Sequence, residues 1–565
     1  MPASTPAALL PPGPRATTSG SVAFASLALA GCGGGGDAPS APPVAGPSNP
    51  GPDVTLAAPT EAQAARLLVQ ASTGPTPADI ARVQSLGYAA WLDEQFEMPR
   101  GLTRWDWLKS KGFDAAANRN TQNGFDAAAW RALIASPDTL RQRVTLALSE
   151  IIVIGMDGLN TPWRAFAGAA WLDLLEEHAF GNLRTLLQAV STSLQMGVYL
   201  TFRGNPKANA ATGTVPDENY ARELMQLFTI GLVELNEDGT PRLAGGQPVE
   251  AYTQDDVTGL ARVFTGWDQD LAGGNTDTPD YQRRPMTQVA SRYETGAKTF
   301  LGLTIPAGTT AAAALTATLD RLFAHPNVGP FWSRQLIQRL VTSNPSPAYV
   351  QRVSRVFADD GRGARGNLRA VVRAILLDDE ARGTAARAST TAGKLREPIL
   401  RLTAWARAFA ATSPSDAWAI GNTGNPGTAL GQSPLRSPSV FNFFRPGYVP
   451  PGSAMAGLAL VAPEFQLANE SSVVGYLNYL QTTIASGRGD VRADYTAWLP
   501  LADTPATLVS QLDVLLAGGQ LDMATRTTIG TAIGAMAGGT DTARRNRVHA
   551  AILLVMASPE FLVPT

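Results

Sequence analysis

The sequence is poor in the residues that carry most redox and metal chemistry. It has one cysteine, Cys32, in 565 residues, so no disulfide can form within the chain, and it has three histidines. Lysine is also scarce, with five residues among 45 basic ones. These 45 basic residues face 47 acidic ones, which leaves no excess of positive charge for a phosphate backbone. We therefore expect no nucleic-acid partner, and the sequence names no cofactor.

Long apolar runs are missing too, apart from a short one that precedes Cys32. The run SVAFASLALA at 21–30 has the length of a signal-peptide core and falls well short of the roughly 18 to 20 residues that span a membrane. It leads into Leu-Ala-Gly-Cys, which resembles the lipobox of bacterial lipoproteins. We interpret 1–31 as a lipoprotein-type signal peptide and Cys32 as the lipidation site. An ordinary secretory signal with a chance cysteine is the alternative.

The residues after Cys32 predict how the protein is divided. Residues 32–59 are rich in Gly, Pro, Ala and Ser, a composition typical of a disordered tether. Residues 60–494 read as a main helical domain, and 495–565 as a C-terminal helical subregion of the same body. Residue 33 is glycine, whereas aspartate commonly retains lipoproteins at the inner membrane. We expect a cell-envelope protein in contact with the membrane through its lipid anchor, at the outer membrane or the cell surface.

The body carries helical signals from residue 60 onwards. Thr76 and Pro77 supply a cap and a first-turn proline, and Gly87 closes that helix before the next one. Strand signals are sparse: GLVELNEDGTPRL, with Asp238-Gly239 as the turn, predicts one hairpin, and regular strands are expected only near 231–252. The fold class is therefore all-α, a large multi-helical body with at most a short β-hairpin.

The most distinctive segment runs from Pro216 to Gly231 and predicts a helix of about four turns. On that helix Asn219, Arg222, Glu223 and Gln226 would form one polar, inward-facing stripe. The next helix begins at YTQDDV, where Thr253 as N-cap and Asp256 three residues later make a capping box.

Four segments together resemble the bacterial family called domain of unknown function 1800. They are ENYARELMQLFTIGL, YTQDDVTGLARVFTGW, ETGAKTFLG and SPSVFNFFRPGYVPPG, and the resemblance covers about 60–560. It implies a secreted or surface-exposed helical protein without an established activity. Members are often encoded beside a second family, of unknown function 1501, that resembles sulfatases. This implies a secreted sulfatase-like partner protein. Some relatives have histidines where this chain has Phe228 and Tyr293, so we assign no metal ligand.

The polar residues of these segments allow a functional and a structural interpretation. As candidate catalytic residues we take Glu218 and Glu223, because two carboxylates can act as acid and base on a polymer. The candidate binding residues are Arg222, Tyr252, Asp256, Trp267, Glu294, Lys298, Asn442 and Arg445. In the structural interpretation Arg222 and Lys298 neutralise the carboxylates in a buried network. A hard-cation site built from the same carboxylates is a third alternative.

Two classes of function follow from these alternatives. The first is a non-catalytic binding or export and assembly scaffold that works with a secreted partner, which we favour. The second is a carboxylate-dependent hydrolase that acts on an extracellular polymer such as a polysaccharide. A triad of His178 with Ser191 or Ser193 lacks a Gly-x-Ser-x-Gly elbow. Solvent access to Glu218 and Glu223 separates the two classes, because an enzyme must expose its carboxylates in a cleft.

Overall fold

Helix caps in the sequence fix where several helices begin. A computed structural model describes residues 58–272, 274–384 and 388–565. Cys32, the signal peptide and nearly all of the tether lie outside these residues. Thr76 caps the helix that starts at Pro77, and Gly87 ends it. The Thr253 hydroxyl accepts from the Asp256 amide, and the Asp256 carboxylate accepts in return from the Thr253 amide, so the predicted capping box is confirmed.

The described chain is mostly helical. Its first half contains α1 (Glu61–Ala71), α2 (Pro77–Leu86), α3 (Tyr88–Glu97), α4 (Arg104–Ser110), α5 (Phe125–Ala135), α6 (Thr139–Ile151), α7 (Arg164–Glu177), α8 (Leu183–Thr192), α9 (Leu194–Tyr199), α10 (Asn219–Gln226) and α11 (Gln254–Ala261), with the 3₁₀ turns η1 (Ala116–Asn118), η2 (Met156–Gly158), η3 (Arg262–Phe264), η4 (Pro279–Arg283) and η5 (Ala290–Arg292). Its second half contains α12 (Ala311–Ala324), α13 (Val328–Leu340), α14 (Pro347–Ala358), α15 (Leu368–Leu377), α16 (Asp379–Arg382), α18 (Pro398–Ala408), α19 (Ala454–Gly457), α20 (Glu470–Ser486), α21 (Pro505–Leu512), α22 (Met523–Gly534), α23 (Asp541–Ala557) and α24 (Pro559–Leu562), with the 3₁₀ turns η6 (Pro463–Leu467) and η7 (Thr496–Asp503) and the π-helical turn η8 (Asp513–Ala517). The all-α class is therefore confirmed.

Strands are short and pair two by two, antiparallel. The pairs are β1 (Leu243–Ala244) with β2 (Gln247–Pro248), β3 (Trp267–Asp268) with β4 (Thr287–Gln288), and β5 (Lys298–Phe300) with β6 (Leu303–Ile305). Only the first pair lies within 231–252, so the expectation that regular strands occur only there was wrong. The β5–β6 hairpin is held by close packing: a Cβ on Gly259 of α11 would lie 1.9 Å from the Thr299 carbonyl oxygen.

The helix expected over 216–231 is shorter than predicted, because α10 covers only Asn219–Gln226. The Thr229 hydroxyl donates to the Leu224 carbonyl at 2.6 Å, and the amides of Phe228 and Ile230 reach back five residues rather than four. A side chain that takes a helical carbonyl competes with the regular ladder. Gly231 then adopts a positive φ of 75°, which closes the turn.

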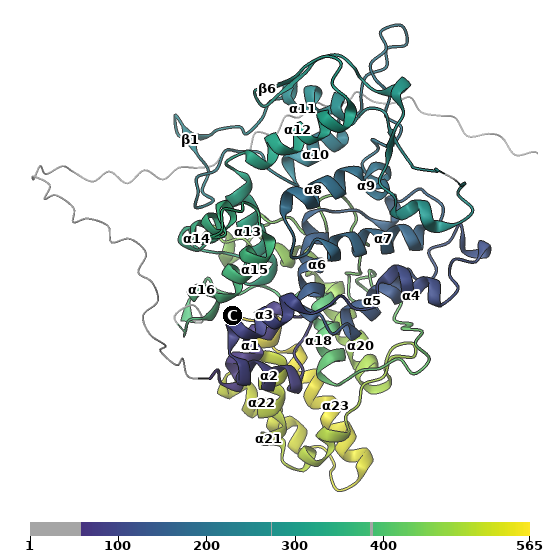
Figure 1. Cartoon of the computed structure of the whole chain (residues 1–565). Helices are drawn as coiled ribbons and strands as arrows, with labels where there is room; N and C mark the ends of the chain where they lie inside the picture. Colours follow the sequence, from purple (N-terminus) through teal and green to yellow (C-terminus); the bar gives the residue numbers. More distant parts are fainter. Residues whose placement is uncertain (1–57, 273, 385–387) are drawn as a thin grey trace, which may run out of the picture. The chain divides into compact units, whose positions relative to one another are not determined.

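Packing joins segments that are far apart in the sequence. Helix α7 packs on α4, α5 and α6, α8 packs on α12, and α13 packs on α14 and α15 (Figure 1). The first helix, α1, packs against η8 near the C-terminus, and α20 packs on α23. Residues 58–565 belong to one compact unit. None of the described helices combines the length and the apolar character that a membrane span requires.

Candidate functional site

Glu218 links two helices through its carboxylate. It lies at the start of α10, and its oxygens accept from Thr258 Oγ1 at 2.7 Å and Gln254 Nε2 at 2.8 Å, both on α11. Arg222 donates to the same carboxylate at 3.2 Å. About a third of the Glu218 side chain is exposed, at 32%. Its acceptor capacity is thus committed to holding α10 against α11.

Glu223 lies in a different environment although it is on the same helix. It is buried, with 7% of its surface exposed, and Oε2 has no hydrogen-bond partner in the described part of the chain. Burial raises the pKa of Glu223, against the opposing charge of Arg222. Arg222 pairs with Glu218, one of the carboxylates that the structural interpretation expects it to neutralise. Among the described residues neither Arg222 nor Lys298 forms an ion pair with Glu223.

The other members of the predicted polar stripe do not face inward. Asn219 is exposed, and Arg222 and Gln226 are partly exposed, so only Glu223 of the stripe is buried. The helix is amphipathic as expected, but its polar side faces solvent because Tyr220, Leu224 and Met225 occupy the core.

Asp256 and Trp267 have structural roles. Asp256 caps α11 and also accepts from the Leu301 amide of the β5–β6 hairpin. Burial raises the pKa of Asp256, but these backbone hydrogen bonds outweigh it and lower the pKa. Trp267 is buried, and its Nε1 donates to the Val263 carbonyl at 3.3 Å. Trp267 therefore cannot present a flat face to a sugar, and the half-buried Tyr252 is left alone in that role.

Lys298 and Glu294 lie beside each other without forming a close ion pair. Lys298 is buried, donates to the Gly296 carbonyl at 3.1 Å and sits 4.7 Å from the centre of the Tyr293 ring. Burial lowers the pKa of Lys298, and the charge of Glu294 opposes this. Glu294 itself pairs with Arg262 at 3.6 Å.

Asn442 and Arg445 lie in the loop 437–448. Asn442 is buried at a positive φ of 63°, and its Nδ2 has no partner in the described chain. Arg445 is exposed and stacks on Phe441 at 4.7 Å. Neighbouring Phe444 is buried beneath the Arg339 guanidinium at 5.0 Å, which ties this loop to α13.

A cleft of about 380 Å³ lies elsewhere, among α4, α7, α8, α9 and η4. Its lining residues are Arg100, Thr103, Trp105, Asp106, Ala170, Asp173, Leu174, Glu177, His178, Ala189, Thr192, Ser193, Gln195, Gln282, Arg283, Arg284 and Pro285. Neither Glu218 nor Glu223 is among them. This is the size of a small-ligand site.

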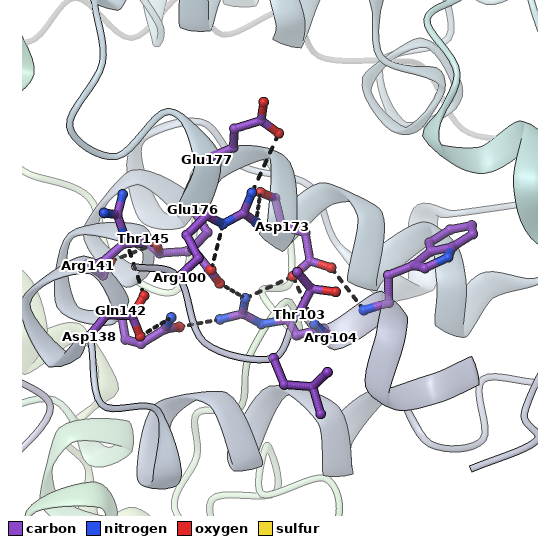
Figure 2. A network of polar contacts seen from close by, with 12 residues as sticks. Arg100, Thr103, Arg104, Asp138, Arg141, Gln142, Thr145, Asp173, Glu176 and Glu177 are labelled. Atoms are coloured by element: carbon purple, nitrogen blue, oxygen red, sulfur yellow. Dashed lines mark hydrogen bonds and ion pairs between the residues drawn. The ribbon is translucent and has the colours of Figure 1, made fainter. Parts of the chain in front are cut away.

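A network of buried ion pairs lies beside this cleft, and we call Arg100, Arg104, Gln142, Asp173 and Glu176 the cleft network (Figure 2). Of these residues Arg100 and Asp173 line the cleft. Arg104 donates to Asp173 at 3.1 Å, to Glu176 at 2.6 Å and to Gln142 at 2.7 Å. The backbone amides of Arg104 and Trp105 also donate to Asp173, at 3.1 and 2.9 Å. Arg100 binds the second oxygen of Glu176 at 3.0 Å. Both oxygens of each carboxylate are therefore occupied.

The serines near His178 have other partners. Ser191 exchanges a hydrogen bond of 2.7 Å with the Tyr220 hydroxyl, while Ser193 caps α9 and donates to the Val190 carbonyl at 2.8 Å. Burial lowers the pKa of His178. The structure brings His178 and Ser193 to one cleft but forms no hydrogen bond between them in the described chain.

A second set of buried charges lies in the protein interior. We call Arg143, Glu150, Arg339, Lys394, Glu397 and Glu464 the interior cluster, which joins α6, α13, η6 and the segment before α18. Lys394 lies 3.3 Å from Glu397 and 3.0 Å from Glu464, and Arg339 lies 3.3 Å from Glu150. Gln432 donates to the second oxygen of Glu397 at 2.9 Å.

The pKa values of two carboxyls in the interior cluster are shifted in opposite directions. Burial and the charge of Glu397 raise the pKa of Glu150 well above its usual value. Burial also acts against ionisation of Glu397, yet the charge of Lys394 and the hydrogen bond from Gln432 lower the pKa of Glu397 to about 2. The two carboxyls titrate as a coupled pair.

Sequence reasoning missed both sets of charges. Arg104, Asp173 and Glu176 lie in segments that read as ordinary amphipathic helices. One signal for the interior cluster existed: Lys394 is one of five lysines in an arginine-rich chain. In the described residues, no three His, Cys, Asp or Glu side chains lie where they could hold a metal ion together.

Comparison with protein families gives one match. The model of a family described as protein of unknown function (DUF1800) matches residues 66–563. No curated protein and no solved structure matches the chain.

Proposed function

The chain belongs to the DUF1800 family, and from this premise and the cleft we propose a non-catalytic binding scaffold of the cell envelope. In this proposal the protein is exported, anchored by a lipid on Cys32, and works with a secreted partner. The single observation that carries the binding role is a cleft whose deepest lining carboxylate, Asp173, already accepts from Arg104 and from two backbone amides.

A general acid or base needs a carboxyl group that can exchange a proton with a bound substrate. In the cleft network both oxygens of Asp173 and Glu176 already accept hydrogen bonds, from arginines and from backbone amides. Such carboxylates position groups around a ligand more readily than they react with it. The cleft therefore supports binding better than hydrolysis.

Hydrolysis of an extracellular polymer is the second candidate, and one observation favours it. The raised pKa of Glu223 is what a general acid needs. Against it, Glu223 is buried, and Glu218 is bound to Arg222, Gln254 and Thr258. Residues five apart on a helix also point about 140° apart, so the two carboxyls do not share a face.

The anchor is tested by Cys32→Ser in the full chain. We expect wild-type protein to take up a palmitate analogue and remain with membranes, and the variant to appear in the soluble fraction without label. Equal labelling of both proteins would disprove the anchor. Lys111→Ala is the control. Lys111 is an exposed residue at the C-terminal end of α4, and its replacement should leave labelling unchanged.

The partner is tested with the purified sulfatase-like protein encoded beside the gene, where the genome has one. We expect the two full chains to elute together in size-exclusion chromatography and to bind with a Kd of about 1 μM or tighter. Separate elution together with no heat of binding would remove this partner from the proposal. Release of reducing sugar from a polysaccharide by the chain alone would favour the hydrolase instead.

A further inference from the structure

The lining of the cleft contains equal numbers of basic and acidic side chains. The basic residues are Arg100, Arg283 and Arg284, and the acidic residues are Asp106, Asp173 and Glu177. His178 adds no charge at neutral pH, because burial lowers its pKa. A site for an anion or a cation carries an excess of the opposite charge. This cleft has none, so its charges do not select a charged ligand.

Several polar groups of the cleft have hydrogen-bonding capacity to spare. Arg284 donates to the Ala272 carbonyl at 2.8 Å and forms no ion pair in the described chain. Asp106 is exposed and, within the described chain, accepts a side-chain hydrogen bond only from the Thr103 hydroxyl, at 2.7 Å. The buried Gln195 donates to the Gln282 carbonyl at 2.6 Å, and its Oε1 has no partner among the described residues. Donors and acceptors thus stand side by side.

Small apolar residues complete the lining. Trp105 is 3% exposed and lies beneath the Arg283 guanidinium, 4.9 Å from its ring centre, so it offers no open face to a ligand. Ala170, Leu174 and Ala189 supply the apolar surface. Sugar rings have hydroxyl groups that donate and accept at once, together with an apolar face, and the polar groups and these aliphatic side chains match both properties.

We propose that this cleft binds a neutral saccharide unit of an oligosaccharide. Arg284 donates to a sugar hydroxyl, Asp106 accepts from one, and Gln195 Oε1 accepts from another deeper in the cleft. No bond in the sugar is broken. This inference deepens the proposed function and rests on the binding role of the cleft given there.

The test is calorimetric titration of the full chain in detergent with three neutral tetrasaccharides: chitotetraose, cellotetraose and maltotetraose. Trigalacturonate is the anionic comparison. We expect at least one neutral probe to bind at concentrations up to about 1 mM, and trigalacturonate to bind more weakly. No binding by any neutral probe, or tighter binding of trigalacturonate, would overturn the proposal.

Variants locate the bound sugar. Arg284→Ala and Asp106→Ala should each weaken binding by about tenfold, because each removes a hydrogen bond from a charged group. Arg321→Ala is the matched control, since Arg321 is an exposed arginine that also donates to a backbone carbonyl, that of Leu301, at 2.8 Å. It should bind like wild type. Unchanged affinity in both cleft variants would place the sugar elsewhere and overturn the proposal.

The same samples separate this inference from the proposed function. Binding without release of reducing ends supports both. Binding with hydrolysis keeps the ligand class and removes the non-catalytic role. No saccharide binding, with the sulfatase-like protein still bound, removes the ligand class and leaves the scaffold.

Discussion

The cleft network and the interior cluster both contain buried arginines and carboxylates, but the carboxylate oxygens of the two sets have different hydrogen-bond partners. In the cleft network every oxygen of Asp173 and Glu176 accepts a hydrogen bond. In the interior cluster neither oxygen of Glu150 or Glu464 has one with acceptable geometry in the described chain, although cations lie within 3.3 Å. Directed hydrogen bonds therefore hold Asp173 and Glu176, whereas close charges hold Glu150 and Glu464.

The source of the donors explains this difference. Two of the donors to Asp173 are backbone amides at the start of α4, which cannot titrate and which favour a negative charge. Lys394 and Arg339 are side chains, and beside them burial raises the pKa of Glu150. Burial also raises the pKa of Asp173 in spite of its backbone donors. Because those backbone donors remain when a side chain is replaced, the cleft network should tolerate substitution better than the interior cluster does.

The largest effect is expected from Lys394→Met, which removes the cation shared by Glu397 and Glu464. Losing one partner of a buried pair typically costs about 3–5 kcal/mol of unfolding free energy. Chemical denaturation followed by circular dichroism measures it. The control Lys111→Met breaks a partly exposed pair with Asp416 and should cost less than about 1 kcal/mol. Equal losses in the two variants would contradict the contrast.

Arg104→Met should cost less than Lys394→Met although Arg104 is just as buried. Asp173 keeps its two backbone donors, and Glu176 keeps Arg100. We expect a loss of about 2–3 kcal/mol, below the upper range for a broken buried pair. The same denaturation experiment measures it. A loss larger than that of Lys394→Met would mean that the backbone donors do not stabilise the Asp173 carboxylate once Arg104 is removed.

The pH dependence of stability should differ between two glutamates of the interior cluster. The folded pKa of Glu150 lies above its unfolded value, so its contribution is present below the unfolded value of about 4.3 and is lost as pH rises through the folded pKa. Glu397 has the opposite sign: its contribution is present above the unfolded value and is lost as pH falls towards about 2.

Glu150→Gln mimics the protonated side chain and should therefore remove the loss of stability that accompanies ionisation of Glu150 as pH rises. Melting temperatures from pH 4 to 10 measure this pH dependence. Glu397→Gln is the comparison, and it should destabilise the protein at pH 6 because it leaves Lys394 short of a counter-charge. A pH profile of Glu150→Gln identical to that of the wild type would show that Glu150 is not the group whose ionisation lowers stability.

The smallest effects are expected on α10, which lies outside both sets of charges. Glu223→Gln should change the unfolding free energy by about 0.5 kcal/mol or less, because in the described chain Glu223 has no ion pair and no partner at Oε2 to lose. Glu218→Gln should cost about 0.5–1 kcal/mol through its partly exposed pair with Arg222. A larger loss of unfolding free energy in Glu223→Gln than in Glu218→Gln would support the interpretation that Glu223 belongs to a buried ionic network.

Local features were predictable from the sequence, and long-range partners were not. Thr76, Thr253 and Asp256 act within three residues of themselves, so their spacing identified them. The length of α10 was overestimated, because a pattern of apolar residues does not indicate the hydrogen bond from the Thr229 hydroxyl to the Leu224 carbonyl. Arg104 binds Asp173 and Glu176, which lie 69 and 72 residues away in the sequence. The spacing of apolar residues does not predict contacts over such separations.

The interior cluster also constrains the order in which the molecule can fold. Arg143 donates to the Arg339 carbonyl across 196 residues, and Lys394 donates to the same carbonyl across 55. During synthesis Arg143 and Glu150 therefore emerge long before α13, which carries Arg339. Closing such long loops is slow. Formation of this cluster should be the late, rate-limiting step of folding, after α4, α6 and α7 have assembled the cleft network.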